Sequence, residues 1–320
     1  MFRRQPKDAS GRFDIRFDAS KPFDVVGFGT NSVDHLCVVP RYPDFDTKTE
    51  VLRYELQTGG PVATAVAALA RMGLRTKYIG KVGSDDFGRI QLESLNGEGT
   101  DTSAVLVAPN ARSQFAFIVI EEAGGERTII WQRDKRLNFG QHELCRADVC
   151  AGRVLHLDGH DPAAVRAAGW ARAEGIPVII DIDGIVAGSE RLIASVDFLI
   201  ASMRFALEFT SATDPCEALR TFNQYGPCFA AITMGAQGAM ALIDDECIQF
   251  PAYAVDAVDT TGAGDVFHAG FIYGLLQNWP LDQIMRFANA AAGLSCTRLG
   301  ARAGLPSLRD VMRLAGIPPA

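Results

Sequence analysis

The sequence lacks three features that would each point to a different class of protein. Acidic residues outnumber basic ones by 38 to 31, and the formal net charge is −7, whereas nucleic-acid binding is typical of a basic excess. Its apolar runs are far shorter than the roughly 20 residues that span a bilayer. The seven cysteines form no C-x-x-C pair, so we expect reduced, mostly buried thiols rather than a metal or redox site. We therefore predict no nucleic-acid partner, no membrane partner and a cytoplasmic location.

The amino-terminal stretch is also poor in apolar runs. Arg3 and Arg4 are followed by polar residues rather than by an apolar segment, so we expect no secretory signal. We expect residues 1–22 to form a flexible leader and residues 23–315 to form a single domain, since no repeat or low-complexity segment divides the chain. With 320 residues, of which 48% are hydrophobic, the chain is long enough to bury a sizeable core.

Strands and helices are predicted to alternate along the second half of the chain. Short apolar runs typical of buried strands, at 154–157, 178–181, 198–201 and 229–233, are separated by helical segments. Such alternation favours a parallel sheet with helices on both faces. Two strand-rich stretches, at about 36–56 and 112–134, interrupt the pattern, and we expect them to pair into one small projecting sheet, called the lid below. The apolar lid residues Phe115, Phe117, Ile129 and Trp131 predict that the lid forms a homodimer interface.

The segment 259–265, Asp-Thr-Thr-Gly-Ala-Gly-Asp, carries the clearest chemical signal. Its glycines permit a tight turn, so the N–H groups of Gly262, Ala263 and Gly264 can point into one concavity. The helix that follows adds partial positive charge there, and such a hole binds phosphate or a phosphoryl group in transfer. Asp265 lies at the mouth of this anion hole, where a carboxylate can act as general base toward an attacking hydroxyl. The alternative is that Asp265 only caps the helix.

Two motifs together resemble a known family, the PfkB-type (ribokinase-like) carbohydrate kinases. The segment 259–265 resembles the family's second signature. The segment 59–73, which begins Gly-Gly-Pro-Val-Ala-Thr-Ala, and the segment 80–88 resemble the first. The resemblance covers about residues 23–310 and implies an α/β fold: a three-layer α/β/α domain with a mostly parallel central sheet and a small β-sheet lid. It also implies transfer of the γ-phosphoryl group of ATP to a hydroxyl of a sugar.

The resemblance assigns roles to matching positions. It implies that Asp265 is the base and that Gly262, Ala263 and Gly264 form the anion hole. It implies sugar contacts at Asp34, Gly59, Gly60, Thr64 and Asp158. Many members carry an Asn where Thr64 stands. The alternative for Asp158 is an N-cap of the following helix.

The nucleotide and metal sites are implied in the same way. The segment 233–238 resembles the family's Thr-x-Gly-x-x-Gly loop, and 297–302 resembles the segment that closes the nucleotide site. The resemblance implies ATP contacts at Thr233, Gly235, Gly238, Thr261 and Gly264. It implies a K⁺ site beside Asp259. Asp181 and Asp183 lie at the end of a predicted strand, where they are candidates to hold a magnesium-bound water; the alternative is that they are only strand-end turn residues.

Departures from the family pattern concern phosphate handling and the acceptor. The family's Asn-x-x-Glu motif falls at 202–205, where neither residue is present; this bears on how Mg²⁺ is held, not on the reaction. The charged residues expected in the lid region are candidates to face an anionic substrate group, with a solvated surface as the alternative. They are Lys48, Arg112, Arg133 and Arg136.

The motifs also indicate a class of acceptor. The motifs are most similar to sulfofructose-kinase-like and ketohexokinase-like members, so we expect a ketose or related sugar. The alternatives are a nucleoside kinase of the same superfamily and a non-catalytic sugar- or nucleotide-binding regulator. A Rossmann-type oxidoreductase is disfavoured because the first strand is not followed by G-x-G-x-x-G.

Overall fold

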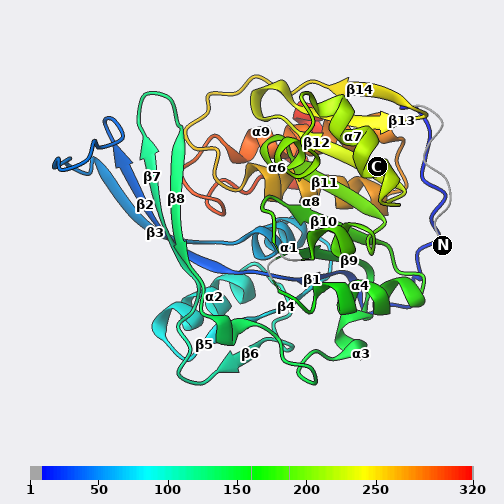
Figure 1. Ribbon diagram of the computed structural model, residues 1–320, viewed down its shortest axis with the longest axis horizontal. Helices are drawn as coiled ribbons and strands as arrows, with labels where there is room; N and C mark the ends of the chain where they lie inside the picture. The colour runs from blue at the N-terminus through cyan, green and yellow to red at the C-terminus, as the bar shows by residue number, and fades with distance from the viewer. Residues whose placement is uncertain (1–8, 160, 187, 319–320) are drawn as a thin grey trace.

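An eight-stranded sheet runs through the computed structural model, which describes residues 9–159, 161–186 and 188–318 (Figure 1). Its strand order is β14-β13-β12-β11-β10-β9-β1-β4. The six strands from β12 to β4 pair in parallel, and the edge hairpin of β13 and β14 is antiparallel. The strands are β1 (Phe23–Phe28), β4 (Thr76–Ile79), β9 (Gly152–Asp158), β10 (Val178–Ile182), β11 (Phe198–Ser202), β12 (Phe229–Thr233), β13 (Ala239–Ile243) and β14 (Glu246–Phe250).

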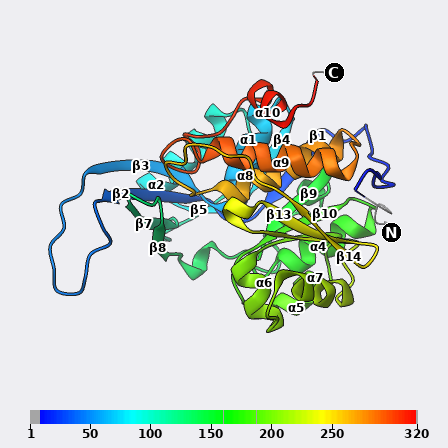
Figure 2. The ribbon, with the colours of Figure 1, turned by 90° about the horizontal axis from the view of Figure 1, so that it is seen from above.

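Helices cover both faces of this sheet (Figure 2). One layer consists of α1 (Pro61–Arg71), α8 (Ala263–Leu276), α9 (Leu281–Ser295) and α10 (Leu308–Ala315). The other contains α3 (Arg146–Val149), α4 (Ala164–Ala173), α5 (Ser189–Ile193), α6 (Met203–Thr210) and α7 (Pro215–Gln224). Successive strand residues point to opposite faces, and accordingly Ile179 packs in the first core and Ile180 in the second. Burial on both faces explains the continuous apolar runs of the parallel strands.

The two interrupting stretches form one sheet, as predicted. Its order is β3-β2-β7-β8, with β2 (Ser32–Val39), β3 (Arg53–Gly59), β7 (Phe115–Glu121) and β8 (Arg127–Gln132). Because β2 follows β1 after only three residues, this lid projects from the carboxyl edge of the central sheet (Figure 1). A short sheet of β5 (Lys81–Gly83) and β6 (Leu106–Ala108) was not predicted; it lies beside α2 (Asp86–Gly97). The predicted fold class, a three-layer α/β/α domain with a mostly parallel sheet and a lid, is confirmed.

The described part of the expected leader is packed against the domain. Phe13 is 5% exposed, and its ring meets those of Phe198 and Phe229 edge-on, with centroids 5.0 and 5.4 Å apart. Backbone hydrogen bonds from Leu281 and Asp282 to residues 11 and 9 anchor the same stretch to the start of α9. The prediction of a loosely attached leader is therefore wrong for residues 9–22, because an aromatic side chain in a polar stretch fills the core. Residues 1–8 lie outside the described residues.

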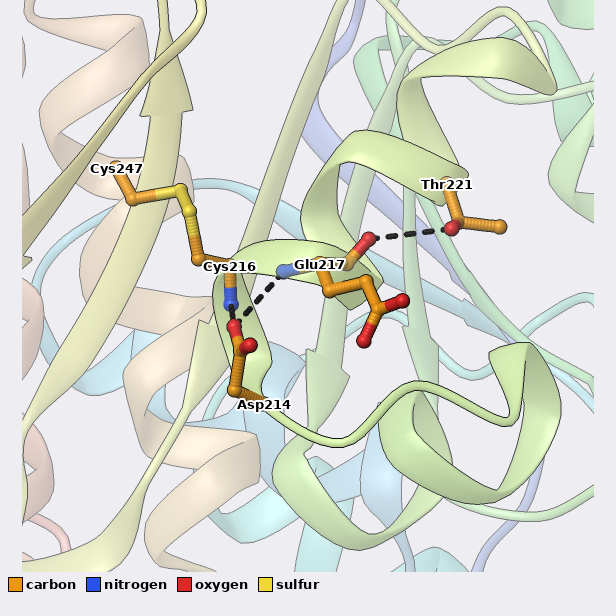
Figure 3. Close-up of a disulfide and its surroundings, with 5 residues drawn as sticks. All are labelled: Asp214, Cys216, Glu217, Thr221 and Cys247. Atoms are coloured by element: carbon orange, nitrogen blue, oxygen red, sulfur yellow. Dashed lines mark hydrogen bonds between the residues drawn. A yellow bond between two sulfur atoms is a disulfide. The ribbon is translucent and has the colours of Figure 1, made fainter.

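The prediction of reduced thiols is wrong for one pair of cysteines. Cys216, in the first turn of α7, is bonded to Cys247 on β14, with a Cα–Cα distance of 5.8 Å (Figure 3). The helix packs beside the edge hairpin, which brings together residues 31 positions apart that no motif connects. The expectation of mostly buried thiols also fails, since only Cys150 and Cys296 of the five free cysteines are buried.

The helices are short relative to a membrane. In the described ranges, none has both the length and the apolar character needed to cross a bilayer.

Replacing Phe13 by Ala should lower the free energy of unfolding by about 3–5 kcal/mol, because the substitution leaves a cavity among aromatic rings. Urea unfolding would measure this change. Arg12→Ala is the matched control, since Arg12 is the exposed neighbour, and its stability should stay within about 0.5 kcal/mol of the wild type. A Phe13→Ala protein as stable as the control would contradict the packing described here.

Candidate active site

A cavity of about 770 Å³ lies between the lid and the carboxyl edge of the central sheet. Parallel strands end at this edge, where open α/β sheets bind ligands. The main domain contributes the start of α1, the ends of β10 and β11, and the loop before α8. The lining residues include Ser32, Asp34, Gln114, Ala116, Ile118, Arg127, Ile129 and Trp131 from the lid side, and Gly60, Asp183, Ser202, Arg204, Thr261, Gly262, Asp265 and Ala301 from the domain.

The loop before α8 has the tight turn expected from its glycines. Gly262 adopts a left-handed φ of 79°, and a Cβ on it would lie 2.7 Å from the Cβ of Ala301. A side chain is therefore excluded there both by conformation and by space. Ala263 N–H donates to Thr260 O (3.2 Å) within the turn. The amino-terminal N–H groups of α8 point along the helix axis toward the cavity edge, where partial positive charge gathers.

Asp265 occupies the first turn of α8 and lines the cavity. Burial raises the pKa of its carboxyl well above the ordinary value, and the charges of Asp181 and Asp183 raise it further. The guanidinium of Arg127 opposes this shift. A carboxylate that holds a proton more tightly than usual is better suited to accept one from a hydroxyl.

Asp34 lies on the lid strand β2 at the opposite wall of the cavity. It is 5% exposed, and Ser32 Oγ donates to its Oδ1 at 2.7 Å. Burial raises the pKa of Asp34 to about 6, so at neutral pH it is mostly ionised. Gly59 passes so close that a Cβ would lie 2.0 Å from Asp34 Oδ2. Gly60, with φ 91°, leaves the backbone open to the cavity.

Three of the predicted sugar contacts, Gly59, Thr64 and Asp158, do not line the cavity. Gly59 is buried against Asp34. Thr64 is fully buried inside α1. Asp158 is 2% exposed, and its Oδ2 accepts hydrogen bonds from Thr30 N (2.7 Å) and Thr30 Oγ1 (2.8 Å). This carboxylate ties the end of β9 to the end of β1 and does not cap α4.

The predicted nucleotide loop lies at the carboxyl end of β12, two strands from β10. Gly235 and Gly238 have positive φ angles of 58° and 88°, and a Cβ on Gly238 would lie 2.1 Å from Phe250 O. Thr233 Oγ1 donates to Ala201 O at 3.4 Å. Thr261 lines the cavity itself, whereas 233–238 lie beside it along the same sheet edge.

The two predicted metal positions differ in what surrounds them. Asp259 is 1% exposed; its Oδ1 accepts from Thr261 N (2.9 Å) and Thr261 Oγ1 (2.7 Å), and its Oδ2 from Gly300 N (2.8 Å). In the described ranges, no three His, Cys, Asp or Glu side chains are grouped to hold a metal. Mg²⁺ bound through phosphates needs only one or two carboxylates, and Asp183 lines the cavity together with Asp265.

The basic residues in the cavity are not the ones predicted. Arg127 and Arg204 line it, whereas none of Lys48, Arg112, Arg133 and Arg136 does. Arg133 donates to Asn138 Oδ1, and Arg136 pairs with Asp134. Alternate residues of a strand point to the same face, so the sequence could have placed Arg127 on the same lid face as Ile129 and Trp131.

The same lid geometry corrects part of the predicted dimer surface. Ile129 and Trp131 face the cavity. Phe115 and Phe117 are on the opposite lid face, because neighbours in the register Ala116↔Trp131 and Ile118↔Ile129 share a face.

Ser202 and Phe205, which stand where the family's Asn-x-x-Glu motif has its Asn and Glu, both have structural roles. Ser202 caps α6, accepting from Phe205 N at 3.3 Å. Phe205 is buried and stacks on Phe209 and Phe222. Phe205 thus puts a core aromatic where the family motif has an acidic side chain. Arg204 and Ser202 are the residues of this turn that line the cavity.

Comparison with known proteins gives one family. The profile of the pfkB family carbohydrate kinases matches residues 24–308. A ribokinase of Haemophilus influenzae is 24% identical over 293 residues, which cover 89% of this chain and 95% of that protein. A 5-dehydro-2-deoxygluconokinase of Shouchella clausii is 26% identical, covering 94% and 98%.

Solved structures show the same architecture. A putative ribokinase from Agrobacterium tumefaciens superposes with a TM-score of 0.86 at 29% identity, covering 92% of this chain and 97% of that one. Arabidopsis thaliana ribokinase complexed with ribose and ATP gives a TM-score of 0.78 at 22% identity, covering 92% and 99%. The second likeness shows the fold alone.

The raised pKa of Asp34 predicts a pH-dependent stability difference. At pH values between the pKa of Asp34 in the unfolded chain and its folded pKa of about 6, the folded state binds more protons than the unfolded state. The free energy of unfolding therefore falls as the pH rises through this range. Relative to Asp34→Asn, the wild-type free energy of unfolding should fall by about 2 kcal/mol from about pH 4 to about pH 7. Urea unfolding of both proteins across this range measures it; a difference that stays constant with pH would contradict the burial of an ionisable Asp34.

Proposed function

Because the chain belongs to the pfkB family of carbohydrate kinases, we propose that it transfers the γ-phosphoryl group of ATP to a hydroxyl of a small carbohydrate, a ketose or related sugar. The observation that carries this proposal is that Asp265 and Asp34 line one cavity. One carboxylate is at the start of α8 and the other is on the lid. A sugar between them can be held by one and deprotonated by the other.

The proposed reaction uses the cavity in a defined order. Asp34, ionised at neutral pH, accepts hydrogen bonds from sugar hydroxyls. Gly60 lines the cavity without a side chain, so the ring can approach closely there, and Gly59 is buried against Asp34. Asp265 takes the proton of the attacking hydroxyl as its oxygen bonds to the γ-phosphorus, and the bond from that phosphorus to ADP breaks. The N–H groups at Gly262–Gly264 stabilise the charge on the phosphoryl oxygens.

The nucleotide and ions are proposed at the same sheet edge. Thr233, Gly235, Gly238 and Thr261 are the proposed ATP contacts. Mg²⁺, when bound, would neutralise phosphate charge, with Asp183 holding it directly or through water. Asp259 keeps its proposed place beside a K⁺ site, where it also fixes the loop through Thr261 and Gly300.

We also propose a homodimer formed through the outer lid face, defined as Tyr54, Leu56, Phe117 and Ile130. These side chains are 43–58% exposed and apolar or aromatic. His35 lies among them, stacking on Phe117 and bonding to Tyr54. An exposed apolar patch of this kind is typical of an interaction site.

Acceptor preference tests the proposed reaction. ADP release with Mg-ATP and K⁺ would be measured against ketoses, aldoses, anionic sugars and nucleosides. We expect a sugar to be the strong acceptor; a nucleoside preference would favour the nucleoside kinase alternative. ATP binding without transfer to any acceptor would favour a binding protein.

Asp265→Asn should lower kcat by roughly two to four orders of magnitude, because the general base is lost, while ATP affinity measured by calorimetry changes little. Asp282→Asn is the matched control: Asp282 lies in the first turn of α9, outside the cavity. If both variants turned over like the wild type, Asp265 would be only a helix cap.

Phe117→Asp should convert the dimer to a monomer, since a charge would be buried in the apolar interface. Light scattering at micromolar concentration measures the mass. Val107→Asp, at an exposed apolar position on β6 away from the lid, should remain dimeric. A monomeric wild-type protein would refute the proposed interface.

A further inference from the structure

Two guanidinium groups in the cavity have no part in the function proposed above. Arg127 begins lid strand β8, and Arg204 lies in the first turn of α6 on the main domain. Among the described residues that line the cavity, they are the two basic ones, facing the carboxylates of Asp34, Asp183 and Asp265. Carboxylates therefore outnumber cations in a site that must receive a highly anionic triphosphate.

Arg127 connects the lid to the loop that precedes α8. Its Nη1 donates to Thr260 Oγ1, in the turn that leads to Gly262. The turn of the same hairpin lies against this segment, because a Cβ on Gly125 would be 3.5 Å from Val258 O. Arg127 lines the same cavity as Asp265, and its charge lowers the pKa of that carboxyl.

Arg204 approaches the cavity from the other wall. Its side chain is exposed, and Nη2 lies 3.5 Å from Asp183 O, beyond the end of β10. It stands one residue before the buried Phe205, in the turn where the family places an acidic residue. The local charge is therefore positive where the family pattern would make it negative.

We propose that Arg127 and Arg204 bind the oxygens of the phosphoryl group in transfer, one from the lid and one from the domain. The guanidinium fork matches phosphate oxygens in pairs and cannot lose its charge at neutral pH. The lid thus contributes a catalytic residue rather than only a cover. This inference rests on the proposed function. The same chemistry would also bind an anionic group on the acceptor, and the experiment separates the two sources.

The test compares Arg127→Ala and Arg204→Ala with Arg136→Ala, using the best neutral sugar acceptor of the wild-type protein. Arg136 is the matched control because it pairs with Asp134 outside the cavity. We expect kcat to fall by about 10²–10³-fold for each of the two cavity variants, the scale for removing one donor to a transition state. The acceptor KM should change less than about threefold, and Arg136→Ala should match the wild type. Added guanidinium should partly restore kcat of Arg127→Ala, which loss of structure alone would not allow.

Each remaining outcome decides against the proposal. The same variants are also assayed with the best anionic sugar acceptor; a KM raised only for that acceptor, with kcat intact for both, would assign the arginines to the acceptor. If an alanine variant melts below the assay temperature, the lysine variant at the same position, Arg127→Lys or Arg204→Lys, is assayed instead. A wild-type kcat in that folded protein would contradict the proposal that a guanidinium binds the phosphoryl oxygens in pairs. An active wild-type enzyme with unaffected alanine variants would overturn this inference alone. A wild-type protein that phosphorylates no acceptor would overturn the proposed function and this inference together.

Discussion

The buried guanidinium of Arg302 joins the parts of the chain that surround the cavity. Its Nη2 donates to Asn31 Oδ1 and to Gly59 O, both at 2.9 Å, and its Nη1 donates to Ser94 Oγ at 3.0 Å. Burial lowers the pKa of Arg302 to about 10, so it stays charged at neutral pH, and its charge stabilises ionised Asp34. One side chain thus joins the two ends of the lid strands β2 and β3 that adjoin the domain, and its charge favours the ionised form of the proposed sugar-binding carboxylate.

The two residues before Arg302 fix the other half of the site. Gly300 N donates to Asp259 at 2.8 Å, and Ala301 leaves no room for a side chain at Gly262. The turn that starts α8 is therefore held by the same short segment that contacts Asn31 and Gly59 near Asp34. This coupling explains how a lid and a loop far apart in sequence keep Asp34 and Asp265 in one cavity.

The sequence was sufficient for those features that local patterns encode. The parallel sheet, the lid and the turn at Gly262 were predicted correctly, because apolar periodicity and glycine spacing determine them, and the predicted family is confirmed. The bond between Cys216 and Cys247 was missed, since it depends on tertiary packing. The arginine at position 127 was missed because charge alone does not show which lid face points inward. The likeness to sulfofructose kinases stays a prediction.

The most direct measurement is a crystal structure with the preferred sugar and a non-hydrolysable ATP analogue bound. We predict a sugar hydroxyl within hydrogen-bonding distance of Asp265, other hydroxyls on Asp34, and the terminal phosphate against the N–H groups that begin α8. A sugar bound away from these carboxylates, or a terminal phosphate remote from Gly262–Gly264, would contradict it.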